Sequence, residues 1–269
     1  MSLRRKRFEL MVFEPNRRRR LVGEDIGRED ASDLFLCLPG LLETRESFDR
    51  FAEHVGDRAR VMTVDWCGRG DSDRLPAAHD YRMSVYLNDL SLFYSHALGA
   101  VGSTARIHLV GTSMGGLLGV VLASHRPQKL GTLILNDVGP MLPWSGVFSL
   151  MTGIGAAKTS DTLEFGSTTL AEKLRVDPNL LRAVRQPAHL DLVHETRLSG
   201  VDFSATFAAV TVPMLLLRGM KSEIINDQVV KRIFELHPLT RIHECSECGH
   251  PVAYSPEVSE AILKFVKSY

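Results

Sequence analysis

The serine in Gly111-Thr112-Ser113-Met114-Gly115 has one glycine two positions before it and another two positions after it. A short apolar run (106–110) precedes this segment, and a second apolar run with helical character (117–124) follows it. A nucleophilic serine between a strand and a helix stands on a sharp turn with its hydroxyl exposed, and glycines on either side relieve the crowding. The amides that begin the helix would face the oxyanion formed by its attack. We therefore predict that Ser113 is the nucleophile of an acyl transfer.

A serine nucleophile needs a general base, and the chain offers 10 histidines. His250 lies between the last expected strand (241–245) and the last expected helix, which starts near Ser255. In a parallel sheet such a loop lies at the carboxyl edge, which is also the edge expected for Ser113. His108 lies inside an expected strand, where packing in the core is the simpler role. We predict that His250 is the base.

Further motifs make the chain resemble the α/β-hydrolase family, in which the catalytic residues follow the order serine, acid, histidine. Residues 65–72, Asp-Trp-Cys-Gly-Arg-Gly-Asp-Ser, are similar to the D-x-R-G-x-G-x-S turn of that family, with Cys67 where arginine is usual. Residues 135–140 and 218–223 resemble segments of one esterase-like bacterial subgroup. The resemblance covers nearly the whole chain. It implies an α/β fold with a mostly parallel eight-stranded sheet, flanking helices and a helical cap insertion.

The acid of the triad has several candidates. The family acid commonly follows the strand that ends here at Leu217, and the matching position is Glu223, where aspartate is more common. Glutamate is one methylene longer but can still orient an imidazole and stabilise its cation. Asp137 is the alternative acid, because some family members take it from the strand ending here at Asn136. Asp227 is the third candidate, although Asn226-Asp227 can equally cap a helix.

The resemblance also implies an oxyanion hole built from two backbone amides. One is the amide of Met114, and the other comes from the loop after the third strand, here Pro39-Gly40-Leu41-Leu42. The family usually has His-Gly in this loop. Because proline has no N–H to donate, we predict Leu41 as the second donor.

These residues are positioned by short apolar runs that alternate with segments of helical period, a pattern typical of a parallel α/β sheet. From 140 to 210 the alternation stops, and we find helical pieces without a clear strand. We predict a core formed by residues 1–139 and 211–269 and a helical cap, residues 140–210, over the carboxyl edge of the sheet. The expected strands are 8–13, 21–26, 34–38, 60–66, 106–110, 129–136, 213–217 and 241–245, and the apolar residues expected in the cap are Met141, Trp144, Phe148, Met151, Leu163, Leu174 and Leu181.

Composition excludes several classes of function. The 32 Lys and Arg are balanced by 32 Asp and Glu, which argues against a nucleic-acid or acidic-membrane partner. Arg17 to Arg20 are expected on the solvated flank of a first hairpin. No apolar run approaches the roughly 18 residues of a membrane span. The 4 cysteines indicate a reducing compartment, so we expect a cytoplasmic protein. We also expect either a monomer or a homodimer. Cys245 and Cys248 lack the second pair that a structural zinc site needs, and no metal is expected.

The residues and the resemblance together predict a serine hydrolase of carboxylic esters, thioesters and lactones included, which acts through an acyl-enzyme on Ser113. Such a mechanism requires no cofactor, and the apolar residues of the cap indicate an apolar acyl pocket of modest size. Two alternatives share these residues. One is a carbon–carbon bond hydrolase or a haloperoxidase-like enzyme, and the other is a ligand-binding protein of the same fold without activity.

Overall fold

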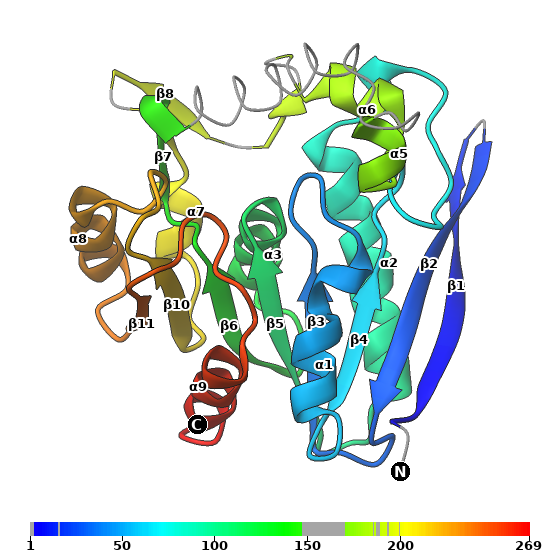
Figure 1. Ribbon diagram of the computed structural model, residues 1–269, viewed down its shortest axis with the longest axis horizontal. Helices are drawn as coiled ribbons and strands as arrows, with labels where there is room; N and C mark the ends of the chain where they lie inside the picture. The colour runs from blue at the N-terminus through cyan, green and yellow to red at the C-terminus, as the bar shows by residue number, and fades with distance from the viewer. Residues whose placement is uncertain are drawn as a thin grey trace.

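A single eight-stranded sheet runs through the computed structural model, which describes residues 3–15, 17–146, 170–184, 186, 189–192, 194–198 and 200–269. Its strand order is β1-β2-β4-β3-β5-β6-β10-β11 (Figure 1). β1 pairs with β2 and β2 with β4 in antiparallel fashion, and every other pair is parallel. The mostly parallel sheet and its eight strands are thus as predicted. The strands are β1 (Arg5–Glu14), β2 (Arg17–Gly27), β3 (Asp33–Leu38), β4 (Arg60–Val64), β5 (Arg106–Thr112), β6 (Leu130–Asn136), β10 (Met214–Gly219) and β11 (Arg241–Cys245).

Helices cover both faces of this sheet, which is why its central strands are mostly apolar on both faces. In β3, Leu34 and Leu36 pack on one face, while Phe35 and Cys37 pack on the other. The second of these faces is covered by α1 (Asp49–Val55) and α9 (Pro256–Val266), which lie in front of the sheet in Figure 1. The first is covered by α2 (Met83–Ala100), α3 (Met114–Ser124), α7 (Ser204–Ala208) and α8 (Asp227–Leu236). Within the described residues, no helix is both long and apolar enough to cross a bilayer.

The arginine run, residues 17–20, lies in β2 of the first hairpin, and not all of its side chains are solvated. Arg18 is exposed, but Arg19 is 2% exposed and pairs with the buried carboxylate of Asp89. Glu14 adds a second contact to Arg19 at 3.0 Å. Burial raises the pKa of Asp89, and the hydrogen bond from Arg19 opposes that shift. The prediction that the whole run is solvated is therefore wrong for Arg19, because alternate residues of a strand face opposite sides.

A second ion pair, between strands β2 and β4, supports a prediction about stability. Asp25 receives two hydrogen bonds from Arg60, at 2.9 and 2.8 Å, and one from Arg4 at 3.0 Å. Burial alone would raise the pKa of Asp25, but these bonds hold it below its ordinary value. Asp25→Asn should therefore lower the free energy of unfolding by about 2 kcal/mol at pH 7.

The pH dependence of this effect has a definite sign. A carboxylate with a lowered pKa stabilises the fold above its unfolded pKa of about 4, and that stabilisation is lost as the pH falls through the folded pKa. Urea unfolding at pH 7 and at pH 3 should thus show a smaller difference between wild type and variant at pH 3. Asp30→Asn is the control, because Asp30 is exposed and pairs only with its neighbour Arg28 among the described residues. An equal loss at both pH values would contradict this account.

The cap segment, residues 140–210, differs from the all-helical prediction. Its described part contains a three-stranded antiparallel sheet, β7-β9-β8, in addition to helices. Each strand has 3 residues, too few for an alternating pattern to stand out in the sequence. Phe148, Met151 and Leu163 lie outside the described residues. The elements are β7 (Met141–Pro143), α5 (Leu170–Leu174), α6 (Pro178–Ala183), β8 (Glu195–Arg197), β9 (Gly200–Asp202) and α7, and those from β7 to β9 lie over the carboxyl ends of the central strands in Figure 1.

Candidate active site

Ser113 stands on the sharp turn expected from its flanking glycines. β5 ends at Thr112 and α3 begins at Met114, so the turn consists of Ser113 alone, with φ 49° and ψ −113°. A positive φ is strained for a residue with a side chain, and such strain is common at functional sites. A Cβ on Gly115 would lie 2.1 Å from the carbonyl oxygen of Leu38, so only glycine lets α3 start this close to β3.

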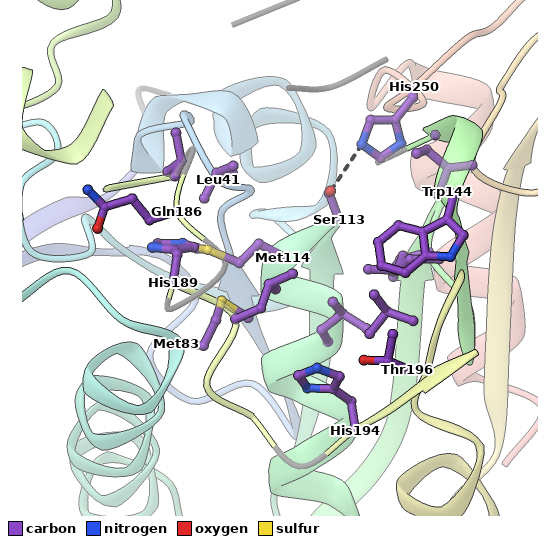
Figure 2. A pocket seen from close by; sticks show the side chains of 18 residues that line it. Leu41, Met83, Ser113, Met114, Trp144, Gln186, His189, His194, Thr196 and His250 are labelled. Atoms are coloured by element: carbon purple, nitrogen blue, oxygen red, sulfur yellow. Dashed lines mark hydrogen bonds between the residues drawn. The ribbon is translucent and has the colours of Figure 1, made fainter. Parts of the chain in front are cut away.

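His250 lies within hydrogen-bond distance of the serine. Its Nε2 is 3.0 Å from Ser113 Oγ, the contact drawn as a dashed line in Figure 2. The loop that carries His250 is anchored to the sheet by Asn136, whose side chain exchanges two hydrogen bonds with the backbone of Val252, at 2.7 and 2.9 Å. The Tyr254 hydroxyl is also 2.9 Å from Thr112 Oγ1. These bonds hold the histidine loop against the strand ends.

Asp137 is the carboxylate beside the histidine. Its Oδ2 is 2.8 Å from His250 Nδ1, and the side chain is fully buried. Oδ1 accepts a hydrogen bond from the Gly219 N–H at 3.0 Å, and the Ser222 hydroxyl donates to Oδ2. Asp137 directly follows β6 and has φ 54°. Serine, imidazole and carboxylate thus form one hydrogen-bonded chain at the carboxyl edge.

Glu223, the acid that we preferred from sequence, does not occupy this position. Glu223 is exposed, and it is its neighbour Ser222 that reaches Asp137. The third candidate, Asp227, is also exposed; it lies in the first turn of α8, behind the helix cap formed by Asn226, and pairs with Arg218 at 2.6 Å. The carboxylate beside His250 is therefore Asp137, the alternative acid, and not Glu223.

The loop 39–42 faces the serine from the other side, and side chains hold its backbone at three points. Trp66 Nε1 donates to the Pro39 carbonyl at 3.0 Å, and the Gly40 N–H donates to Glu43 at 2.7 Å. The Leu41 carbonyl accepts from Arg69 Nε at 2.9 Å. Burial raises the pKa of Glu43, while the bond from Gly40 and the nearby His250 oppose that shift. The loop is thus fixed without the histidine that is usual in the family.

Arg69 is a residue that the sequence reasoning missed. It is 1% exposed, and besides Leu41 it donates to the Cys67 carbonyl at 2.9 Å. Its guanidinium lies 4.5 Å from the ring centre of Tyr86, and Nη2 is 4.0 Å from Met114 Sδ. Arg69 therefore contacts both residues predicted for the oxyanion hole. The only signal in the sequence was the position of Arg69, two residues after Cys67, which stands where the family usually has arginine.

A cavity of about 270 Å³ opens beside Ser113 and His250 (Figure 2). Both the core and the cap segment contribute to its wall. Among the described residues, no lysine, arginine, aspartate or glutamate lines it. The apolar lining residues are Leu41, Met83, Met114, Leu117, Val138, Leu142, Trp144, Gly146, Val184, Leu190, Val201 and Ile224, and the polar ones are Ser113, Gln186, His189, His194, Thr196 and His250.

The four cysteines are free thiols, with Cys37 and Cys67 buried and Cys245 and Cys248 partly exposed. Burial raises the pKa of Cys245 to about 11. In the part of the chain that the structure describes, no group of three or more histidine, cysteine or acidic side chains is arranged to hold a metal ion.

Comparison with known proteins identifies the class to which this fold and site belong. Residues 33–165 match the family model of the alpha/beta hydrolase fold. An alpha/beta hydrolase from Novosphingobium aromaticivorans superposes with a TM-score of 0.74 at 24% identity, covering 98% of this chain and 99% of that one. A thermophilic esterase from Thermogutta terrifontis gives 0.70 at 18% identity, covering 98% of each chain. The chain therefore has the α/β-hydrolase fold, and residues 33–165 are similar to the family of that fold.

Among curated proteins, the chain is similar to hydrolases of different substrates. It is 25% identical to the 3-hydroxybutyrate-oligomer hydrolase of Cupriavidus necator, covering 85% of this chain and 86% of the relative. It is 28% identical to the 2-hydroxy-6-oxononadienedioate/2-hydroxy-6-oxononatrienedioate hydrolase of Paraburkholderia xenovorans, covering 71% of this chain and 70% of the relative.

Proposed function

We propose that the protein is a serine hydrolase of carboxylic esters, with thioesters and lactones in the same reaction class. The observation that carries the proposal is the hydrogen-bonded chain Ser113–His250–Asp137, which opens into a cavity without charged lining residues among those described. An uncharged, largely apolar wall suits a substrate with a short apolar acyl chain better than a substrate that carries a charge.

The chemistry follows from the positions of these atoms. His250 Nε2 takes the proton of Ser113 Oγ as the oxygen attacks the acyl carbon. Asp137 accepts the bond from Nδ1–H and stabilises the imidazolium. The N–H groups of Met114 and Leu41 stabilise the tetrahedral oxyanion. His250 then protonates the leaving alcohol, which leaves an acyl-enzyme on Ser113. In the second half of the reaction, His250 activates the water that releases the acid from Ser113.

The described pocket favours esters over the dicarboxylates of the carbon–carbon bond hydrolases. A dioate carries two carboxylates, which need cationic partners when they are buried. The described lining offers none. By contrast, hydroxy acids such as 3-hydroxybutyrate join to one another through esters, so the similarity to a 3-hydroxybutyrate-oligomer hydrolase supports ester cleavage. The intact hydrogen bonds of the three side chains argue against a ligand-binding protein without activity.

A fluorophosphonate probe tests the proposal directly, because it reacts only with an activated serine. We expect labelling of Ser113, located by peptide mass spectrometry, together with turnover of short-chain p-nitrophenyl esters. A protein that neither reacts with the probe nor hydrolyses these esters is not a serine hydrolase, and this outcome would overturn the proposal.

Arg69 provides a further prediction, because it holds the carbonyl of Leu41 and touches Met114. Arg69→Met should lower kcat for p-nitrophenyl butyrate by about 10²-fold, the cost of a misplaced oxyanion donor. Arg69→Lys should recover only part of this loss, since an ammonium group cannot match the planar fork of arginine.

The matched control is Arg74→Met, because Arg74 lies on the same loop and is exposed. Melting temperatures separate loss of folding from loss of catalysis. If folded Arg69→Met retains the wild-type kcat, Arg69 does not position the oxyanion hole.

A further inference from the structure

His189 places an unusual polar atom in the wall of the cavity. The side chain belongs to the cap segment, lines the cavity and is 5% exposed. Figure 2 shows His189, Gln186 and Leu41 on one side of the cavity and His250 and Trp144 on the other. His189 therefore lies on the side of the cavity opposite the proposed base.

The hydrogen bonding of His189 fixes which nitrogen carries the proton. Nδ1 lies 2.9 Å from the carbonyl oxygen of Tyr81, which can only accept, so Nδ1–H is the donor. Burial, together with the guanidinium of Arg69, lowers the pKa of His189 to about 4. The ring is thus neutral at pH 7, and Nε2 presents a lone pair that accepts hydrogen bonds.

This acceptor is unpaired within the part of the chain that the structure describes. Among the described residues, Nε2 of His189 is buried and makes no hydrogen bond. Buried polar atoms are normally paired, and an unpaired one costs about 1–3 kcal/mol. The Tyr86 hydroxyl is also unpartnered and its ring centre is 5.7 Å from that of His189, but Tyr86 does not line the cavity. Nε2 is therefore an unsatisfied buried atom on a side chain that lines the cavity.

We propose that His189 Nε2 accepts a hydrogen bond from a hydroxyl group of the substrate, so that the enzyme selects hydroxylated esters over their plain counterparts. This inference rests on the proposed ester hydrolysis. A hydroxyl group suits the site because it brings one donor on a compact carbon chain. An amide would also bring a carbonyl that needs its own donor in a largely apolar cavity. The hydroxyl can belong to the acyl half or to the alcohol half of the ester.

Matched ester pairs distinguish the two halves. Ethyl butyrate is compared with ethyl 2-, 3- and 4-hydroxybutyrate, and propyl butyrate with 2-hydroxyethyl butyrate, by titration of the released acid. For one of these pairs we expect the wild-type kcat/KM to be about 10-fold higher with the hydroxyl than without it. The pair that shows the preference tells which half of the ester His189 contacts.

Variants of His189 test whether this acceptor is the cause. His189→Phe keeps a ring but has no acceptor, and the preference ratio should fall close to one. His189→Gln keeps an oxygen near the place of Nε2 and should retain a clearly higher ratio. His189→Met replaces the phenylalanine variant if that protein does not fold. A merely structural role would change kcat/KM for both members of a pair and leave their ratio unaltered. This outcome would overturn the proposal, and a buried water would then be the partner of Nε2.

Binding to the Ser113→Ala protein separates this inference from the proposed function. If wild-type protein hydrolyses plain esters without any preference for hydroxylated ones, ester hydrolysis stands and the role of His189 is refuted. If no ester is hydrolysed, calorimetry can still compare how tightly the site binds ethyl 3-hydroxybutyrate and ethyl butyrate. Tighter binding of the hydroxylated ester, lost in Ser113→Ala/His189→Phe, would support the hydroxyl contact, and equal binding would refute it.

Discussion

Replacing Asp137 by asparagine is expected to lower kcat for ester hydrolysis by about 10⁴-fold. The amide of asparagine can donate to Nδ1 of His250, which would move the ring proton to Nε2 and leave no base facing Ser113. It also removes the negative charge that stabilises the imidazolium formed during attack. The change is nearly isosteric, so the contacts to Gly219 and Ser222 are disturbed as little as any substitution allows.

Glu223→Gln is the matched control, because it makes the same chemical change at an exposed carboxylate on the neighbouring loop. Its kcat should stay near the wild-type value. Both variants are assayed with p-nitrophenyl butyrate at several pH values, after melting curves confirm that they are folded. Loss of activity in Glu223→Gln with normal activity in Asp137→Asn would reverse our assignment of the acid.

Replacing Ser113 by alanine is expected to have the largest effect, a fall in kcat of about 10⁶-fold. The residual rate would come from substrate binding and from the oxyanion donors, which do not depend on the serine side chain. The variant should no longer react with a fluorophosphonate but should still bind ester, since the cavity wall is otherwise intact. Alanine keeps the Cβ of serine and loses only the hydroxyl, so the turn should be retained, and melting curves check that the variant is folded.

Ser103→Ala is the control for this experiment, because Ser103 is exposed and lies before β5, at the opposite end of that strand from Ser113. It should keep both its activity and its labelling. Turnover by Ser113→Ala at a rate near that of the wild type would exclude the acyl-enzyme mechanism.

The fold and two members of the proposed triad could be predicted from sequence because each leaves a local pattern. The eight strands of the large sheet were all predicted, most of them from apolar runs, and the glycines around Ser113 marked a turn that needs them. His250 could be selected by its position between the last strand and the last helix. These signals depend on neighbours in the chain, and a single sequence contains them.

The acid could not be chosen in this way, because its identity depends on neighbours in space. Leu217 pairs with Asn136 across β10 and β6, so the carboxylates that follow these strands start from the same edge of the sheet. What separates them is the direction of the side chain: Asp137 turns inward to the Gly219 amide, whereas Glu223 is exposed. Arg69 was missed for the same reason, since only the folded chain brings it to Leu41 and Met114. The strands of the cap segment were missed because three residues are too few to show an alternating pattern.

The hydrogen bonds that hold the histidine loop and the acid have a consequence for how this protein can diversify. Asn136 with Val252, Thr112 with Tyr254 and Gly219 with Asp137 all join one core segment to another. In the described part of the chain, the cap segment supplies ten of the residues around the cavity but none of these anchors. Sequence drift within residues 140–210 can therefore exchange one substrate range for another while the reacting atoms keep their spacing, so chemistry and selectivity are inherited as separable traits.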